Sequence, residues 1–145
     1  MNWQKVSIER LKVYEERKRA VESIPEQIKN LKNSFGAIRA ASNDATAVKG
    51  GGISREDALL SNIVMREELK KNYKIAISEI RTTEKGLNAL TKEQRLILDK
   101  FYICRTTNYI EDLCEELCVE RSRIYTLKDE ALKRFTIACY GVVEI

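Results

Sequence analysis

The chain has 145 residues, of which 43% are hydrophobic and 33% charged, so it is long enough for one domain or two small units with a charged surface. Its single proline and six glycines interrupt regular structure in few places, which favours long helices over strands and turns. The net charge of +4 is too small to indicate a nucleic-acid ligand by itself. Because histidine is absent, we expect no enzyme, no metal site and no other cofactor.

The chain carries no export or membrane signal that we can identify. No apolar run approaches the roughly 18 residues that a membrane helix needs. The first residues, MNWQKVSIERLKVYEERK, are too polar for a signal peptide. We therefore expect a cytoplasmic protein with no membrane partner, in which the four cysteines remain thiols.

The first predicted helical segment runs through a stripe of apolar residues at steps of three and four. This stripe comprises Val21, Ile24, Ile28, Leu31, Phe35 and Ile38. Pro25 lies within it, and Ser23 to Glu26 also resembles a capping box with proline in the first turn. Either one long helix kinks at Pro25, or one helix ends near Glu22 and a second begins there.

A second long segment follows residues 42–53, which are small and polar and include three consecutive glycines. Its apolar stripe again has helical spacing and comprises Leu59, Ile63, Leu69, Tyr73, Ala76, Ile77 and Ile80. A lone amphipathic helix is unstable in water, so the two segments must pack. We expect a long, coiled-coil-like helical hairpin over residues 1–86, closed within one chain or between two, that forms a homo-oligomer.

The pattern changes after Gly86, where we place the domain boundary. Thr91 to Gln94 predicts a capping box, and three short amphipathic segments follow at about 92–102, 109–117 and 121–136. Short helices with short connections predict a compact three-helix domain over residues 87–145. The fold class we expect is therefore all-α.

Residues 107–135 have the order of residue types that a helix-turn-helix requires. The first helix offers apolar Leu113 and small Cys114, and a turn at Cys118 precedes the aliphatic Val119. The second helix has an inward stripe of Ile124, Leu127, Ala131 and Leu132. Five basic and two acidic side chains lie between residues 121 and 134, so the basic charge is local to the helix that would enter a DNA groove.

Two protein families share these motifs. The segments LTKEQRLILDKFY, VERSRI and EALKRF resemble region four of bacterial primary sigma factors, which reads the upstream promoter element. Two charged helices before a motif ending LKDEALKRFTIACYG also resemble phage transcriptional regulators of the RinA and ArpU type. These resemblances imply a sequence-specific, double-stranded-DNA-binding regulator of late phage genes, encoded by a phage or prophage, with RNA polymerase as a further partner.

The sequence departs from the sigma pattern at two positions. That pattern has a glycine at the turn, whereas this chain has Cys118, which predicts a wider turn because left-handed backbone is costly for other residues. It also has an acidic residue where this chain has Ser122, so the base preference of the sigma factors does not carry over.

The resemblance assigns roles to individual residues. Arg121 is expected to be the main base reader, since arginine bonds bidentately to guanine, with Ser122, Tyr125 and Thr126 as secondary readers. Contacts to DNA phosphate are expected from Arg123, Lys128, Lys133 and Arg134, and from Thr107 and Asn108 at the start of the preceding helix.

Other interpretations remain open. The basic residues can form an ordinary solvated helix face, and Cys114 and Cys118 are interpreted as core or turn residues and not as half of a metal site. One alternative function is a DNA-packaging recognition subunit resembling the small terminase. Another is a sigma-like module that contacts protein and has lost DNA binding.

Overall fold

The computed structural model describes residues 1–41 and 54–143, and within these ranges the regular structure is entirely helical. The all-α prediction is therefore confirmed, and the glycine-rich connector 42–53 lies outside the described residues. No helix in the described ranges is long and apolar enough to cross a membrane. The helices are α1 (Trp3–Lys12), α2 (Tyr14–Ala40), α3 (Arg55–Asn88), α4 (Lys92–Leu98), the π-helix η2 (Asp99–Ile103), α5 (Tyr109–Leu117) and α6 (Arg121–Tyr140).

The chain divides into two compact units. The first combines Met1–Lys18 with Ser78–Ile145, and the second consists of Arg19–Ile77. This division differs from the boundary expected near Gly86, because α1 and the last turns of α3 pack against α6. The C-terminal helices therefore form one compact unit with α1, the first residues of α2 and the end of α3.

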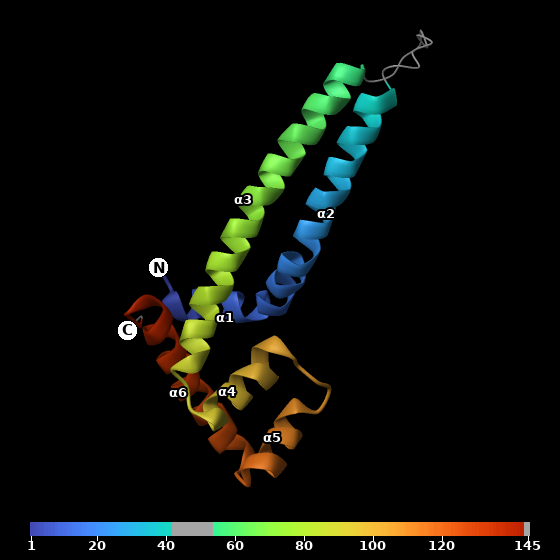
Figure 1. Ribbon diagram of the computed structural model, residues 1–145. Helices are drawn as coiled ribbons and strands as arrows, with labels where there is room; N and C mark the ends of the chain where they lie inside the picture. Colours follow the sequence, from blue (N-terminus) through green and yellow to red (C-terminus); the bar gives the residue numbers. More distant parts are fainter. Residues whose placement is uncertain (42–53, 144–145) are drawn as a thin grey trace. The chain divides into compact units, whose positions relative to one another are not determined.

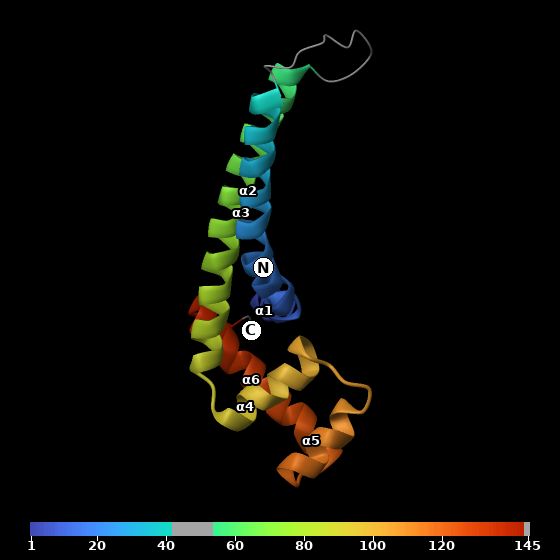
Figure 2. The same cartoon turned by 45° about the vertical axis from the view of Figure 1, so that its right-hand side comes forward.

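The second unit is a pair of helices, in which the long stretches of α2 and α3 lie side by side (Figures 1 and 2). The side-chain amide of Asn62 donates to the carbonyl of Leu31 at 2.8 Å, and the Arg66 guanidinium lies 5.1 Å from the centre of the Phe35 ring. Ile24 and Ala76 are buried. Polar contacts thus supplement a thin apolar seam between the helices.

Pro25 lies inside α2, which is one element from Tyr14 to Ala40. The alternative of a helix end near Glu22 is therefore wrong. The break between helices comes earlier in the chain. Val13 is the C-cap of α1, and α2 begins at the next residue. Proline costs a helix the hydrogen bond of its missing N–H, and α2 continues through it nonetheless.

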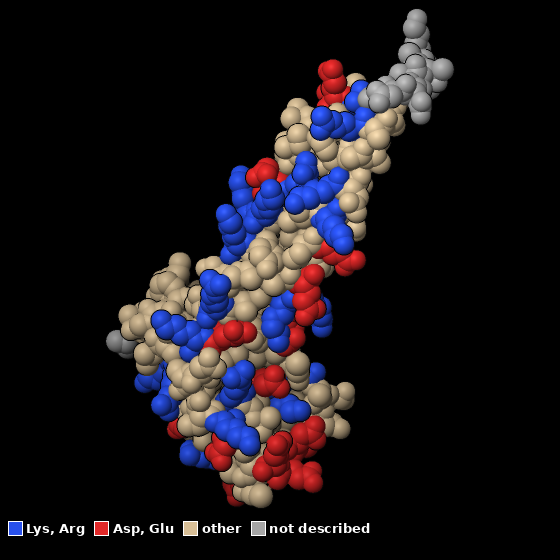
Figure 3. All heavy atoms as spheres, in the orientation of Figure 1, with Lys and Arg blue, Asp and Glu red and all other residues tan. Residues whose placement is uncertain are grey.

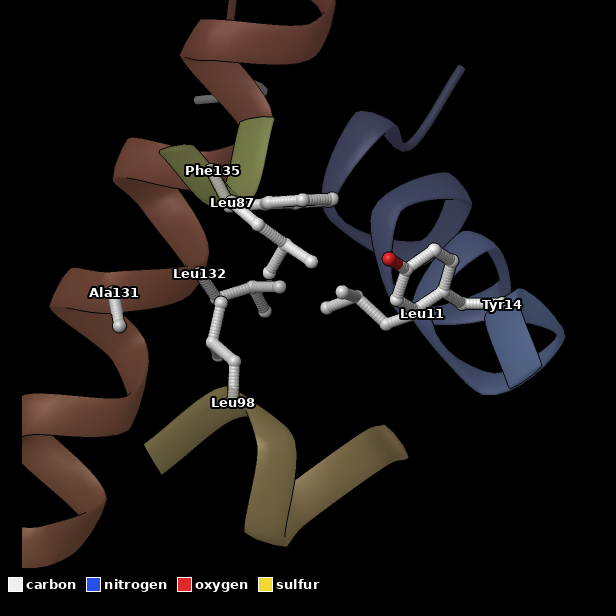
Figure 4. Packing of buried hydrophobic residues seen from close by; sticks show 7 residues of the cluster. All are labelled: Leu11, Tyr14, Leu87, Leu98, Ala131, Leu132 and Phe135. Atoms are coloured by element: carbon white, nitrogen blue, oxygen red, sulfur yellow. The ribbon is translucent and has the colours of Figure 1, made fainter. Parts of the chain in front are cut away.

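The first unit has a core between α1 and α6, shown in Figure 4. Leu11 and Tyr14 from the N-terminus point toward Leu87 and toward the leucines of α4 and α6. The seven buried members are Leu11, Tyr14, Leu87, Leu98, Ala131, Leu132 and Phe135. The short α1 was not anticipated from the sequence, yet it closes this core.

Polar contacts also join α1 to α6 and to the end of α3. Ser7 Oγ and Thr136 Oγ1 lie 2.8 Å apart and are both fully buried. Because Thr136 donates to the carbonyl of Leu132 at 2.7 Å, Ser7 is the donor to Thr136. Arg10 forms a 2.6 Å salt bridge with Glu79 and donates to the Tyr140 hydroxyl at 2.6 Å. Every buried polar atom of these three contacts is thereby satisfied.

A second core in the same unit lies among α4, η2, α5 and α6. Its buried members are Ile97, Phe101, Ile110, Leu113 and Ile124. The predicted capping box starts α4, with Gln94 N donating to Thr91 Oγ1 at 3.2 Å and Thr91 N to the Gln94 side chain at 3.1 Å. A π-turn continues α4 and places Phe101 in this core. These contacts fix the orientation of α5 and α6.

Candidate nucleic-acid interface

A tight turn joins α5 to α6. Leu117 ends α5, and Cys118 takes a left-handed backbone with φ 54° and ψ 45°. The N–H of Val119 donates a hydrogen bond to the carbonyl of Cys114 at 3.2 Å, which is the bond that closes a helix end in a Schellman motif. The expected wider turn is therefore wrong, because Cys118 itself adopts the conformation that glycine adopts more easily.

Apolar packing fixes which face of α6 is turned outward. Leu113 of α5 and Ile124 of α6 are both fully buried, and Val119 and Leu127 pack against the same core. Further along α6, Ala131 and Leu132 are buried as the helical spacing predicts. With this stripe inward, the opposite face of the N-terminal half of α6 is open to solvent.

The four residues predicted to read bases are all exposed on that half of α6: Arg121, Ser122, Tyr125 and Thr126. The Arg121 guanidinium lies 3.6 Å from the carboxylate of Glu111, and both side chains remain about two-thirds exposed. The Thr126 hydroxyl donates to the carbonyl of Ser122 at 3.4 Å. Residues four apart share a helix face, so Arg121 lies beside Tyr125 and Ser122 beside Thr126. The two pairs are adjacent and form one polar surface.

Within this surface, the ring of Tyr125 contacts the buried ring of Phe101. Phe101 lies edge-on to Tyr125 with ring centres 6.0 Å apart, and edge-on to Tyr109 of α5 at 5.1 Å. Such edge-to-face pairs hold rings in place. Tyr125 is still 41% exposed, so part of this residue remains open to solvent.

The residues predicted to contact phosphate divide into two kinds. Arg123, Lys133 and Arg134 are exposed. The Lys128 side chain is only 20% exposed, lies 5.8 Å from the Phe101 ring centre and forms a 2.6 Å salt bridge with Asp129. Burial lowers the pKa of Lys128, but the hydrogen bond with Asp129 and the charge interactions with Asp129, Tyr102 and Tyr125 together outweigh it, so the net pKa is raised and the charge is retained.

Thr107 and Asn108 are exposed beside the first turn of α5. Asn108 occupies the N-cap position, and its side chain makes no capping hydrogen bond. Sequence reasoning missed Arg105, which donates to the Tyr109 hydroxyl and lies 4.3 Å from its ring centre. Its position two residues before Thr107, a predicted phosphate contact, could have indicated it as a further cation of this surface. Arg105 adds an exposed cation beside the aromatic cluster.

The surface of α5 has the opposite charge. Its exposed carboxylates are Glu111, Asp112, Glu115 and Glu116, and Figure 3 shows acidic side chains gathered over this helix. Exposed cations are concentrated on α6 at Arg121, Arg123, Lys133 and Arg134. A polyanion would therefore be attracted to α6 and repelled by the acidic face of α5.

Comparison with known proteins places the chain in a family. Neither curated proteins nor solved structures provide a match. The family DUF1492, described as a protein of unknown function, matches residues 37–136, which include α3, α4, α5 and most of α6. Because this match covers more than half of the chain, the protein belongs to the DUF1492 family.

Proposed function

We propose that this protein is a sequence-specific regulator of transcription that binds double-stranded DNA by a helix-turn-helix formed by α5 and α6. The N-terminal half of α6 enters the major groove. The resemblance to the RinA and ArpU regulators supports a role in late phage gene activation, in a bacterial cytoplasm, with RNA polymerase as a further partner. A homo-oligomer formed through the two long helices would supply the second half-site contact that tight binding needs.

One observation carries this proposal: the tight turn at Cys118 holds α6 so that its polar N-terminal half is exposed while its apolar stripe is buried. A recognition helix needs this combination, because its packed face fixes the orientation that its outer face presents to the base edges. The side chains on the outer face suit this role, since arginine, serine and threonine all bond to base edges.

Arg121 has the central role in the proposal. It is the first residue of α6, and it exchanges its exposed ion pair with Glu111 for a guanine edge. An exposed ion pair is worth at most about 1 kcal/mol, whereas a bidentate contact to guanine discriminates by about 1–3 kcal/mol. The exchange therefore favours DNA.

Two substitutions separate base reading from phosphate binding. Arg121→Ala is expected to relax sequence preference, measured by competition between a selected duplex and its single-base variants. Lys133→Ala, at a second exposed cation of α6, is expected to weaken binding to all duplexes to the same extent and to reduce the salt dependence. Unchanged sequence preference in Arg121→Ala would remove this residue from the reading role.

The acidic surface of α5 favours a second candidate function, a module that contacts protein and does not bind DNA. Four exposed carboxylates on one short helix oppose the approach of a polyanion and suit a basic protein surface. Undetectable affinity for any duplex at low salt, together with salt-sensitive binding to RNA polymerase or a sigma factor, would favour this candidate.

A further inference from the structure

The outward face of α3 in the two-helix unit carries apolar side chains that no described residue of the unit covers. Leu60 and Ile75 are each 61% exposed and Val64 is 53% exposed. On α3, Asn62 and Arg66 contact Leu31 and Phe35 of α2. The buried or half-buried Leu69, Tyr73 and Ala76 lie on the same side of the helix by their spacing. At 3.6 residues per turn, Leu60, Val64 and Ile75 lie on the opposite side of the helix from these.

Two charged residues complete this face. Glu68 and Lys71 follow Val64 and precede Ile75, so the four residues from Val64 to Ile75 have steps of four, three and four and share one helix face. Glu68 and Lys71 form an exposed ion pair at 3.3 Å, with side chains 60% and 69% exposed. We call Leu60, Val64, Glu68, Lys71 and Ile75 the outer stripe.

The outer stripe is complementary to a second copy of itself that runs in the antiparallel direction. From Val64 to Ile75 its order is apolar, acidic, basic, apolar, and the spacing is symmetric about the point midway between Leu69 and Lys70. A second α3 running antiparallel about a two-fold axis at that point brings Val64 opposite Ile75 and Glu68 opposite Lys71. The same axis creates both apolar contacts and both charge pairs, as an isologous interface requires.

The two-helix unit also has too little core of its own. Among its described residues, Ile24 and Ala76 are the only hydrophobic side chains that are buried. Isolated amphipathic helices gain most of their stability from packing of an apolar face, so a pair with this seam is stabilised by further burial. A second copy provides that burial on the face opposite α2.

We propose that the outer stripe of α3 forms an antiparallel homodimer interface with the outer stripe of a second copy of this chain. This names the surface for the oligomer in the proposed function, but it rests on α3 and not on DNA binding by α6. Its test is made without DNA, so that failure of either proposal is distinguishable from failure of the other.

The test is sedimentation velocity of the full chain over a range of concentrations at low salt. The wild type is expected to dimerise. Glu68→Lys and Lys71→Glu each place like charges opposite one another at two symmetric sites, so each is expected to weaken dimerisation by about tenfold or more. The double variant E68K/K71E restores opposite charges across an antiparallel interface and is expected to recover wild-type dimerisation.

Further variants test the apolar contacts and serve as controls. Val64→Lys, at an exposed position, is expected to give monomers with unchanged helix content by circular dichroism. Lys70→Glu removes an exposed lysine of α3 outside the outer stripe and is expected to leave dimerisation unchanged. A parallel pairing would bring each residue opposite its own copy, so the single charge reversals would then have no such effect.

Four results would overturn the proposal. The first two are a wild-type monomer at all concentrations and single charge reversals that do not weaken dimerisation. The others are a double variant that fails to recover dimerisation and a Val64→Lys variant that dimerises as well as the wild type. Recovery in the double variant after loss in both single variants supports the antiparallel interface, because neither substitution alone restores the pairing.

Discussion

The guanidinium of Arg121, the first residue of α6, lies 3.6 Å from the carboxylate of Glu111 in the first turn of α5. The pair spans the two helices proposed to form the DNA-binding motif. Because both side chains are about two-thirds exposed, the pair contributes little to stability, but it holds a negative charge beside the surface proposed to contact DNA. Glu111 therefore competes with DNA for Arg121.

Glu111→Gln is accordingly expected to raise affinity for duplex DNA by about two- to fivefold at low salt, because it frees Arg121 and removes a charge that repels phosphate. Fluorescence anisotropy with a labelled duplex measures this change. Glu56→Gln, which removes an exposed carboxylate from the first turn of α3, is the matched control and is expected to leave affinity unchanged. Equal or lower affinity in Glu111→Gln would argue against DNA contact at Arg121.

Cys118→Gly is expected to stabilise the protein by about 1 kcal/mol. Cys118 has φ 54°, a left-handed conformation that glycine adopts without the steric cost of a Cβ, and its exposed side chain sacrifices little burial. Cys118→Val should be destabilising, since a β-branched residue tolerates this conformation least. Urea unfolding measures both. A less stable Cys118→Gly would show that the thiol contact to the Glu115 carbonyl at 3.7 Å outweighs the backbone strain.

Gly86→Ala is expected to destabilise the protein by about 1–3 kcal/mol because a Cβ at this position would lie 2.7 Å from the Phe135 ring and closer still to the Cys139 sulfur. Gly36→Ala is the matched control, since nothing lies within 4 Å of a Cβ there and α2 gains about 0.5–1 kcal/mol from alanine. Thermal unfolding compares the two. Equal effects at the two glycines would show that α3 and α6 are not closely packed at Gly86.

Asp99→Asn is expected to raise the melting temperature at neutral pH. Burial raises the pKa of Asp99 above its usual value, and the nearby carboxylate of Glu15 raises it further, against Lys100, which lowers it. The ionised form is therefore disfavoured in the folded protein. Stability contributed by the protonated form is lost as the pH rises through the window between the usual and the raised pKa.

The gain from Asp99→Asn should consequently disappear as the pH falls below the usual pKa of an aspartate, where the wild-type carboxyl is protonated in both the folded and unfolded states. Melting curves of both proteins across this range measure the difference. A stabilisation that persists at the lowest pH would assign the effect to a cause other than the charge of Asp99.

The local pattern of the sequence predicted α5 at its observed bounds and placed Leu113, Ile124, Ala131 and Leu132 correctly as buried. These assignments depend on helical spacing, which the sequence displays directly. The threonine at Thr91 and the glutamine three residues later likewise predicted the capping box. The predicted reading residues are exposed where the spacing places them, and their role in DNA binding stays a prediction.

Long-range contacts explain what the sequence pattern did not reveal. The fully buried contact between Ser7 and Thr136 joins residues 129 positions apart, and neither residue type signals burial. The change of helical pattern after Gly86 was interpreted as a domain boundary, but Gly86 allows a close approach of α3 to α6. A wider turn was expected because left-handed backbone is costly at Cys118, but the closure of the α5 terminus and the packing of Val119 hold Cys118 in that conformation.

Selection of the purified protein against a random duplex library, with the affinity of the selected sequence followed against salt, tests the proposed function most directly. We expect one recovered motif, read by α6, with affinity that falls steeply as salt rises. Repeated half-sites in the recovered sequences would match two copies of α6 in one oligomer. Absence of binding to any duplex at low salt would contradict the proposed DNA-binding function.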